Sequence, residues 1–318
     1  EDGIRDVERS RGLGDVYKRQ MSCLPIAKEF KVPYLYTGST YTVNPKGNRY
    51  LLRVMPSVRS DVRATVDWVR KVGKKFSILY IDYAYGWSMR DEFSWVVEQI
   101  GGKVTEKIAI PVGTVDVAPY AAKVSKDVDA IILGMVGSSE SLGAIKALRE
   151  LGYEQPTVSL IYPWEGIDIE DPELAKWFEG CYFFDNTPRI LSAYDTANNR
   201  EFRKILGIDE RGREIGNPRN ATSWAPLVWS GFFALAESLE AVGWKGPEDT
   251  PKLIKWWEGH VFKESLGHPY GDWLFRAEDH YPFRAKHVLT IEKGKLKLEE
   301  RISYKKAITF EPEVDFTK

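Results

Sequence analysis

The chain has 318 residues, of which 43% are hydrophobic and 13% aromatic, and its formal net charge is −1. This length suggests about two domains, at roughly 150 residues each. The small net charge argues against a nucleic-acid or anionic-membrane partner, which would need a concentrated basic face, and no apolar run approaches the ~18 residues of a membrane span.

Residues 1–20 carry many charges and no hydrophobic period. This segment resembles a translated sequencing adapter fused to an open reading frame, and such a scar is excluded from fold reasoning. A basic arm that touches nucleic acid is the alternative, although the acidic residues of the segment offset much of its basic charge. We expect no function in residues 1–20.

A strand followed by a helix is the clearest pattern in the chain. An apolar run that starts at Lys75 is rich in β-formers and ends at Asp82 and a Tyr-Gly turn, after which Phe93, Val96 and Ile100 recur at helical spacing. Further strands are predicted at Lys103–Ile110, Asp129–Val136, Thr157–Ile161 and Gly180–Phe184, with helical patterns at 118–126, 140–151 and 171–178. This alternation predicts a parallel sheet covered on both faces, which binds ligands at the carboxyl ends of its strands.

Five segments, taken in order, carry a resemblance to a known family. They are Pro25–Tyr34, Tyr36–Thr40, Asp82–Gly86, Pro111–Asp116 and Arg276–His280. From about Met21 to the C-terminus the chain resembles the leucine/isoleucine/valine-binding family, the periplasmic receptor subunits of branched-chain and related amino acid importers. The resemblance implies an α/β fold of two Rossmann-like lobes, each a parallel sheet flanked by helices, joined by three crossover hinges.

The same resemblance implies a division of the chain. Residues 21–54 and 186–287 would form lobe 1, and residues 55–185 and 288–318 would form lobe 2, with hinges near Val54, Asp185 and His287. Family members begin with a signal peptide and the first strands of lobe 1, including a ligand loop. We therefore expect an N-terminally truncated chain with an incomplete lobe 1, and a periplasmic location although no signal peptide is present.

Lobe 1 offers a turn that suits a carboxylate. A zwitterionic amino acid needs donors for its carboxylate, an anion or aromatic face for its ammonium and apolar walls for its side chain. Ser39 and Thr40 follow a predicted strand and Gly38, so their hydroxyls and N–H groups can point together at a carboxylate. In the resembled family the matching turn holds the α-groups of the ligand. An ordinary Ser/Thr N-cap would use the same residues.

Two turns of lobe 2 offer further contacts. Tyr85 follows the first predicted strand of this lobe, where the family has a ligand-facing Tyr before Gly; Tyr83 is the competitor, because alternation sends one of the two into packing. Ser138 and Ser139 follow another strand, at a place where relatives use polar or aromatic ligand contacts. A helix-capping role for these serines is the alternative.

The turn Ile161–Gly166 carries the predicted site for the ammonium. Glu165 precedes a Gly much as the ammonium-binding Glu does in the resembled receptors, and a buried carboxylate is costly without a cation. An exposed loop acid is the alternative. Tyr162 and Trp164 would supply cation–π or apolar walls, or else pack the hinge. Trp224 begins a predicted helix that ends at Gly243. At the position of Trp224 relatives often carry an aromatic residue near the ligand; packing in the core is the alternative role for Trp224.

Motifs for catalysis and metal binding are missing from the sequence. The segment 137–141 fails the GxSxG pattern at Ser141, the histidines lack HExxH spacing, and Cys23 and Cys181 lack CxxC spacing. We expect no enzymatic activity, no cofactor and no metal.

The sequence therefore predicts a periplasmic receptor of an ABC importer that binds a small, branched-chain-like amino acid or related polar solute by lobe closure. Its expected partners are this solute and the permease subunits, and the receptor is expected to be a monomer. A ligand-sensing regulator of the amide-sensor type on the same fold, or a receptor for small amides or carboxylates, is the alternative.

Overall fold

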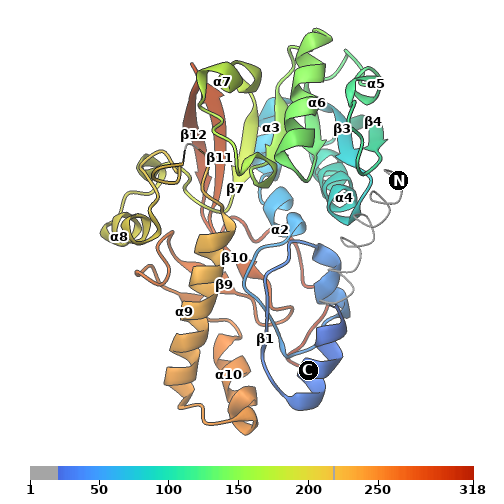
Figure 1. Ribbon diagram of the computed structural model, residues 1–318. Coiled ribbons are helices and arrows are strands. Elements are labelled where there is room, and N and C mark those ends of the chain that lie inside the picture. The colour runs from blue at the N-terminus through green and yellow to red at the C-terminus, as the bar shows by residue number, and fades with distance from the viewer. Residues whose placement is uncertain (1–20, 218) are drawn as a thin grey trace, which may run out of the picture.

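The computed structural model describes residues 21–217 and 219–318, so the expectations for residues 1–20 lie outside the described residues. Two lobes are visible in Figure 1, with a large sheet in the upper one and α9 and α10 in the lower one. Residues 21–30 are helical. The other helices are α2 (Val58–Arg63), α3 (Val66–Val72), α4 (Ala84–Gln99), α5 (Ala118–Ala121), α6 (Ser138–Glu150), α7 (Pro172–Phe178), α8 (Ala197–Leu206), α9 (Trp224–Val242) and α10 (Thr250–Trp257), with short 3₁₀ helices η1 (Tyr41–Lys46), η2 (Tyr162–Trp164), η3 (Leu191–Ala193) and η4 (Pro247–Asp249). None of the helices in the described residues has the length and apolar character needed to cross a membrane.

The large sheet has seven strands within the described residues, in the order β12-β11-β7-β6-β5-β3-β4. The strands are β3 (Lys75–Ile81), β4 (Lys103–Ile110), β5 (Ala130–Gly134), β6 (Thr157–Leu160), β7 (Tyr182–Asp185), β11 (Lys286–Glu292) and β12 (Lys295–Ile302). Strands β3 to β7 run parallel, whereas β11 is antiparallel to both β7 and β12. The predicted parallel sheet is confirmed, with small shifts at the strand ends.

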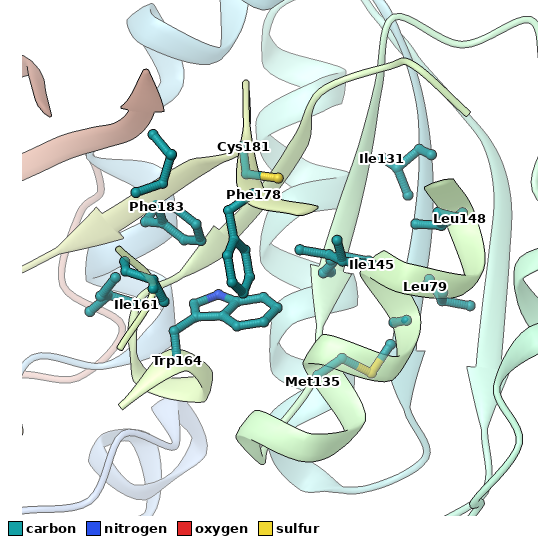
Figure 2. Packing of buried hydrophobic residues seen from close by; sticks show 14 of the residues in the cluster. Leu79, Ile131, Met135, Ile145, Leu148, Ile161, Trp164, Phe178, Cys181 and Phe183 are labelled. Atoms are coloured by element: carbon teal, nitrogen blue, oxygen red, sulfur yellow. The ribbon is translucent and has the colours of Figure 1, made fainter. Parts of the chain in front are cut away.

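The two faces of this sheet bury separate hydrophobic clusters, because side chains alternate along each strand. On β3, Ile78 and Tyr80 join a cluster with Phe93 of α4. Leu79 and Ile81 belong to the cluster on the opposite face, which includes residues of α6 and α7 (Figure 2). Helices thus cover both faces, as a parallel sheet requires.

One predicted helix is shorter than its pattern. The pattern at 118–126 indicated a helix of nine residues, but α5 ends at Ala121. Beyond it, the backbone N–H of Ser125 donates to Glu106 Oε2 and the N–H of Asp127 donates to the Ser125 hydroxyl. These side chains compete with the helical carbonyls for the backbone donors, so the helix stops early.

The lower lobe contains two small sheets in the described residues. Strands β1 (Tyr34–Tyr36) and β2 (Leu51–Arg53) pair in parallel, and β8 (Val261–Phe262), β9 (Trp273–Phe275) and β10 (Pro282–Phe283) form an antiparallel sheet. Helix α9 approaches the end of β2 closely at Gly231, where an added Cβ would lie 2.9 Å from the Val54 side chain. A larger residue at position 231 would push the helix away from the strand.

Segments from the predicted hinges lie side by side. In the register of β11 and β7, His287 pairs with Asp185. Lys286 Nζ lies 2.6 Å from Asp61 Oδ1 in α2 and also bonds the Asn186 side chain, and Lys286 is buried. One lysine therefore joins α2, β11 and the segment that follows β7. The division of the chain at residues 54, 185 and 287 stays a prediction.

The last residues return from β12 to the lower lobe. The Arg276 guanidinium donates to the Phe310 carbonyl at 2.6 Å, and the backbone N–H of Phe316 donates to the Glu278 carbonyl at 2.6 Å. Glu313 forms an ion pair with Arg59 of α2. The C-terminus accordingly lies in the lower lobe in Figure 1.

Candidate functional site

The turn at Ser39 and Thr40 is held by a buried arginine. Arg53 of β2 has no solvent exposure and donates to the carbonyls of Gly38, at 2.7 Å, and Thr40. Its Nε donates to Asn44 Oδ1 at 2.6 Å. Thr40 precedes η1, but its side chain makes no capping hydrogen bond. The N-cap alternative therefore does not account for the Thr40 hydroxyl.

Tyr85 lies in the first turn of α4, and its hydroxyl is buried. Among the described residues this hydroxyl has no hydrogen-bond partner. Burial raises its pKa above the ordinary value, and the nearby charges of Asp61 and Glu165 raise it further. A buried hydroxyl without a partner is uncommon in proteins and suits contact with a solute. Tyr83 packs against the opposite cluster of the sheet.

Ser138 and Ser139 begin α6, and the N-cap position before them is Gly137. Gly137 has no side chain that could accept a hydrogen bond from the first N–H groups of α6. The Ser139 hydroxyl donates to the Glu140 carboxylate at 3.1 Å. The two serines therefore do not cap α6. The predicted contact of Ser138 with a solute stays a prediction.

Trp164 lies in the core instead of the cleft. Its side chain has no solvent exposure, and its Nε1–H donates to the Ser159 hydroxyl at 2.8 Å. Phe178 and Phe183 pack edge-on against the indole (Figure 2). The predicted role of Trp164 as a ligand wall is therefore not supported, because the one-turn helix η2 points this residue inward. The side chain of Tyr162 lies outside what the structure describes.

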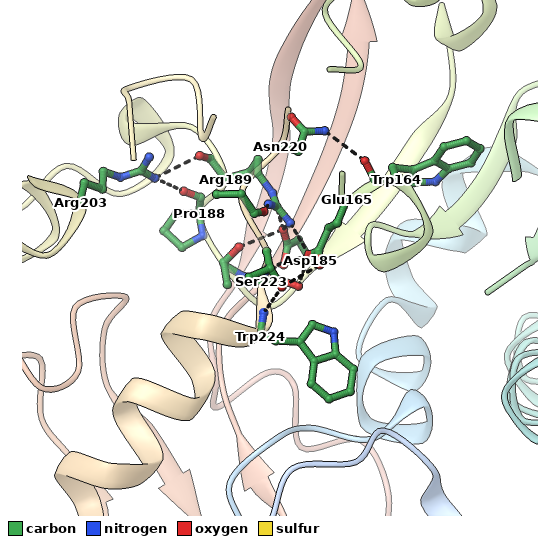
Figure 3. A network of polar contacts seen from close by, with 12 residues as sticks. Trp164, Glu165, Asp185, Pro188, Arg189, Arg203, Asn220, Ser223 and Trp224 are labelled. Atoms are coloured by element: carbon green, nitrogen blue, oxygen red, sulfur yellow. Dashed lines mark hydrogen bonds and ion pairs between the residues drawn. The ribbon is translucent and has the colours of Figure 1, made fainter. Parts of the chain in front are cut away.

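Glu165 is placed at the N-terminus of α9 by partners from three residues (Figure 3). Its carboxylate accepts from Arg189 Nη2 at 3.0 Å, from the Thr222 hydroxyl at 2.9 Å and from the Ser223 backbone N–H at 2.6 Å; the Ser223 hydroxyl donates to it as well. A carboxylate at a helix N-terminus is stabilised by the unpaired N–H groups and by the helix dipole. The cation that the partly buried Glu165 requires is thus supplied by Arg189 of the chain itself.

Arg189 is the residue that sequence reasoning missed in this network. It also bonds Asp185, with 2.9 Å between Nη2 and Oδ2, and it donates to the Ala221 carbonyl. Burial alone would lower the pKa of Arg189, but the charges of Asp185 and Glu165 outweigh burial and raise it. Burial also raises the pKa of Asp185. The signal in the sequence that could have identified Arg189 is its position four residues after Asp185, the last residue of β7.

Trp224 begins α9 next to this network. Its backbone N–H donates to the Thr222 hydroxyl at 3.1 Å, and its indole extends away from Arg203 in Figure 3. The side chain is partly exposed. This position is compatible with the predicted contact to a solute, which stays a prediction.

A cavity of about 310 Å³ lies between η1 and α4. It is lined by Thr40, Tyr41, Thr42, Lys46, Ala84, Trp87, Ser88, Arg90 and Asp91. Thr40 follows β1, and Ala84 and Ser88 follow β3, so the cavity lies beyond the carboxyl ends of two strands. Of the predicted site residues, Thr40 lines this cavity, and it faces the first residues of α4 there.

Asp279 and His280 in the segment 278–280 have structural partners. Asp279 pairs with Arg276, with 2.7 Å between Oδ1 and Nε, and His280 Nδ1 lies 2.7 Å from the Leu51 carbonyl. Among the described residues, no group of His, Cys, Asp and Glu side chains is arranged to hold a metal ion.

Comparison with known proteins gives three findings. Residues 19–295 match the model of a family described as periplasmic binding protein. A Leu/Ile/Val-binding protein homolog of Brucella suis is 24% identical over 241 residues, which cover 74% of this chain and 58% of that protein. The chain thus spans less than two thirds of the length of this curated relative.

Solved structures show the same fold. A solute-binding protein of an ABC transporter from R. palustris, in complex with benzoate, superposes with a TM-score of 0.70 at 19% identity, covering 89% of this chain and 74% of that one. A leucine-binding protein of Thermotoga maritima superposes with a TM-score of 0.69 at 17% identity, covering 89% and 77%.

Proposed function

The chain belongs to the periplasmic binding protein family, and from this premise we propose that it is the solute receptor of an ABC importer. It binds a small solute that carries a carboxylate in the cleft between its lobes, in the periplasm, and delivers this solute to permease subunits. Binding and release need no bond to be made or broken, so the proposed role is that of a receptor and not of an enzyme.

The observation that carries the proposal is the cavity shared by η1 and α4. Thr40 comes from one lobe and Ser88 from the other, so a solute in this cavity contacts both. Receptors of this architecture close as rigid bodies about their hinges when a solute contacts both lobes. The Tyr85 hydroxyl, which is buried and has no hydrogen-bond partner in the part of the chain that the structure describes, lies on the same helix α4 and supports a polar solute.

Two solute classes are compatible with the comparisons, because the similar structures hold benzoates or are named for leucine. For an amino acid, the Ser39/Thr40 turn would bind the carboxylate and Glu165 the ammonium. This arrangement requires Glu165 to share its carboxylate with Arg189 and Ser223.

The test is a thermal-shift screen of the full chain against amino acids, amides and small carboxylates, followed by calorimetry. A bound solute raises the unfolding free energy by RT ln(1 + [L]/Kd), about 2.7 kcal/mol at a concentration of 100 Kd. Stabilisation by one class at micromolar concentration is the expected result. A chain that no small solute stabilises would refute the receptor function.

A further inference from the structure

The cavity between η1 and α4 has aromatic walls that are fixed in place. The Tyr41 ring lies 4.2 Å from the Arg59 guanidinium carbon, a cation–π distance. On α4, Trp87 is 45% exposed, and its Nε1–H donates to Asp82 Oδ1 at 2.7 Å, which sets the plane of the indole. The Tyr41 hydroxyl can donate, since a tyrosine is protonated at neutral pH and burial raises its pKa further. Fixed rings in a cavity of about 310 Å³ suit a flat solute.

The acids at the cleft already have partners. Asp91 Oδ1 lies 2.7 Å from Arg90 Nε, Asp82 accepts from Trp87, and Glu165 accepts from Arg189 and Ser223. An ammonium group at Asp91 or Glu165 would compete with the arginine that already pairs with that acid, whereas Asp82, which keeps its charge beside the neutral Trp87 indole, is solvent-exposed and lies outside the lining of the cavity. Burying a charge without a partner is costly, so the cleft disfavours a solute cation.

The cations at the cavity are not balanced in the same way. Arg90 is paired with Asp91. Lys46, the last residue of η1, is exposed, and its ammonium forms no ion pair with any residue in the ranges 21–217 and 219–318. The lining of the cavity therefore has one cation in excess, together with the hydroxyl of Thr40, whereas the Ser88 hydroxyl donates to the Ala84 carbonyl at 2.9 Å. A lysine ammonium and a threonine hydroxyl are groups that bind a carboxylate.

We infer that the cavity binds a flat carboxylate without an α-amino group, with its ring against Tyr41 and Trp87 and its carboxylate at Lys46. This inference rests on the proposed receptor function and selects one of its two solute classes. Lys46 is then a specificity-determining residue of the receptor. An α-amino acid of the same size is rejected because its ammonium would face Lys46, and Asp91, the acid in the lining of the cavity, is already paired with Arg90.

Matched pairs of solutes test the class. Calorimetry on the full chain compares 3-phenylpropanoate with L-phenylalanine and 4-methylpentanoate with L-leucine, since each pair differs by the α-amino group alone, and includes benzoate as the rigid ring. We expect benzoate and 3-phenylpropanoate to bind at least about 10-fold more tightly than L-phenylalanine, the size of one charged hydrogen bond. Tighter binding of either amino acid than of its deaminated partner would overturn the inference and leave the receptor function standing.

Variants of Lys46 test the location. Lys46→Met should weaken benzoate binding by roughly 10-fold or more, and Lys46→Arg should restore it to within a few-fold. Lys107→Met, an exposed lysine on β4 outside the cavity, is the matched control and should bind like the parent. Unchanged benzoate binding by Lys46→Met would remove the assignment although the receptor function holds. Binding of none of the probes, and of no solute in the wider screen, would refute the receptor function itself.

Discussion

The Oε1 atom of Glu165 lies 2.6 Å from the backbone nitrogen of Ser223, so a carboxylate from the turn after β6 occupies the N-terminus of α9. The two residues are 58 positions apart in the chain. Helix α9 belongs to the lower lobe of Figure 1, and β6 is a strand of the seven-stranded sheet in the upper lobe, so this contact connects the lobes directly. Its strength should influence how readily the cleft closes.

Glu165→Gln removes the charge of this contact and keeps its size. Arg189 retains Asp185 as a partner, so the free energy of unfolding should fall by only about 2 kcal/mol, the value of a charged hydrogen bond. If the contact favours the closed arrangement, all solutes should lose affinity by the same factor, at most about 30-fold. Urea denaturation and calorimetry with 3-phenylpropanoate and L-phenylalanine measure both effects.

The control for this variant is Glu173→Gln, which breaks an exposed ion pair with Lys176 and should change stability by less than about 0.5 kcal/mol. A selective loss of L-phenylalanine binding in Glu165→Gln, with 3-phenylpropanoate unaffected, would show instead that Glu165 binds the ammonium of a solute.

Arg53→Met should destabilise the chain and disturb the turn at Ser39 and Thr40. The buried guanidinium satisfies the carbonyls of Gly38 and Thr40, and each carbonyl left without a donor costs about 1–3 kcal/mol. We expect a total loss of about 3 kcal/mol in denaturant unfolding, together with weaker solute binding. Arg70→Met, which removes an exposed pair with Asp67, is the control and should leave both quantities nearly unchanged. Equal stability of the two variants would contradict the role of Arg53.

His287 should make the chain less stable in acid. Burial, with a smaller contribution from Arg301, lowers its pKa to about 3, whereas its pKa in the unfolded chain is about 6.5. Between these values the unfolded chain binds a proton that the folded chain does not, so the stabilisation is complete above about pH 6.5 and is lost as the pH falls. The slope is about 1.4 kcal/mol per pH unit for this one histidine. His287→Leu should therefore flatten the curve of unfolding free energy against pH between 6 and 4, and an unchanged slope would exclude His287 as its source.

Two tryptophans should respond in opposite ways to truncation. Trp164→Ala leaves a cavity in the core beside Phe178 and should cost about 3–5 kcal/mol of stability. Trp87→Ala removes a half-exposed side chain from the cleft, so stability should change little while the affinity for benzoate falls. Thermal melts and calorimetry on both variants separate the roles. Loss of stability in Trp87→Ala and not in Trp164→Ala would reverse the assignment.

Local patterns predicted much of the fold because periodicity and turn chemistry act over short stretches of chain. The strand from Lys75, the helix after it and the stop of α9 at Gly243, which has φ of 59°, follow from such patterns. The early end of α5 was missed, because it depends on the Glu106 side chain of a neighbouring strand.

The candidate site was harder to predict because its contacts span long distances in the chain. Arg189 and Glu165 are 24 residues apart, and nothing local to either residue indicates the pair. Trp164 and Glu165 are adjacent, yet one side chain points into the core and the other toward α9; in a single turn of helix, one step of register decides which residue points inward. The family resemblance indicated the turn as a whole but not this orientation.

The return of the C-terminal residues to the lower lobe limits how the lobes can move. Residues 310–316 contact Arg276 and Glu278, while Glu313 pairs with Arg59 of α2, so the tail adds a connection to those of the three predicted crossovers. A body attached to another at several points can rotate about the line through these points, but relative twisting would stretch at least one attachment. Opening and closing of the two lobes should therefore follow a single axis.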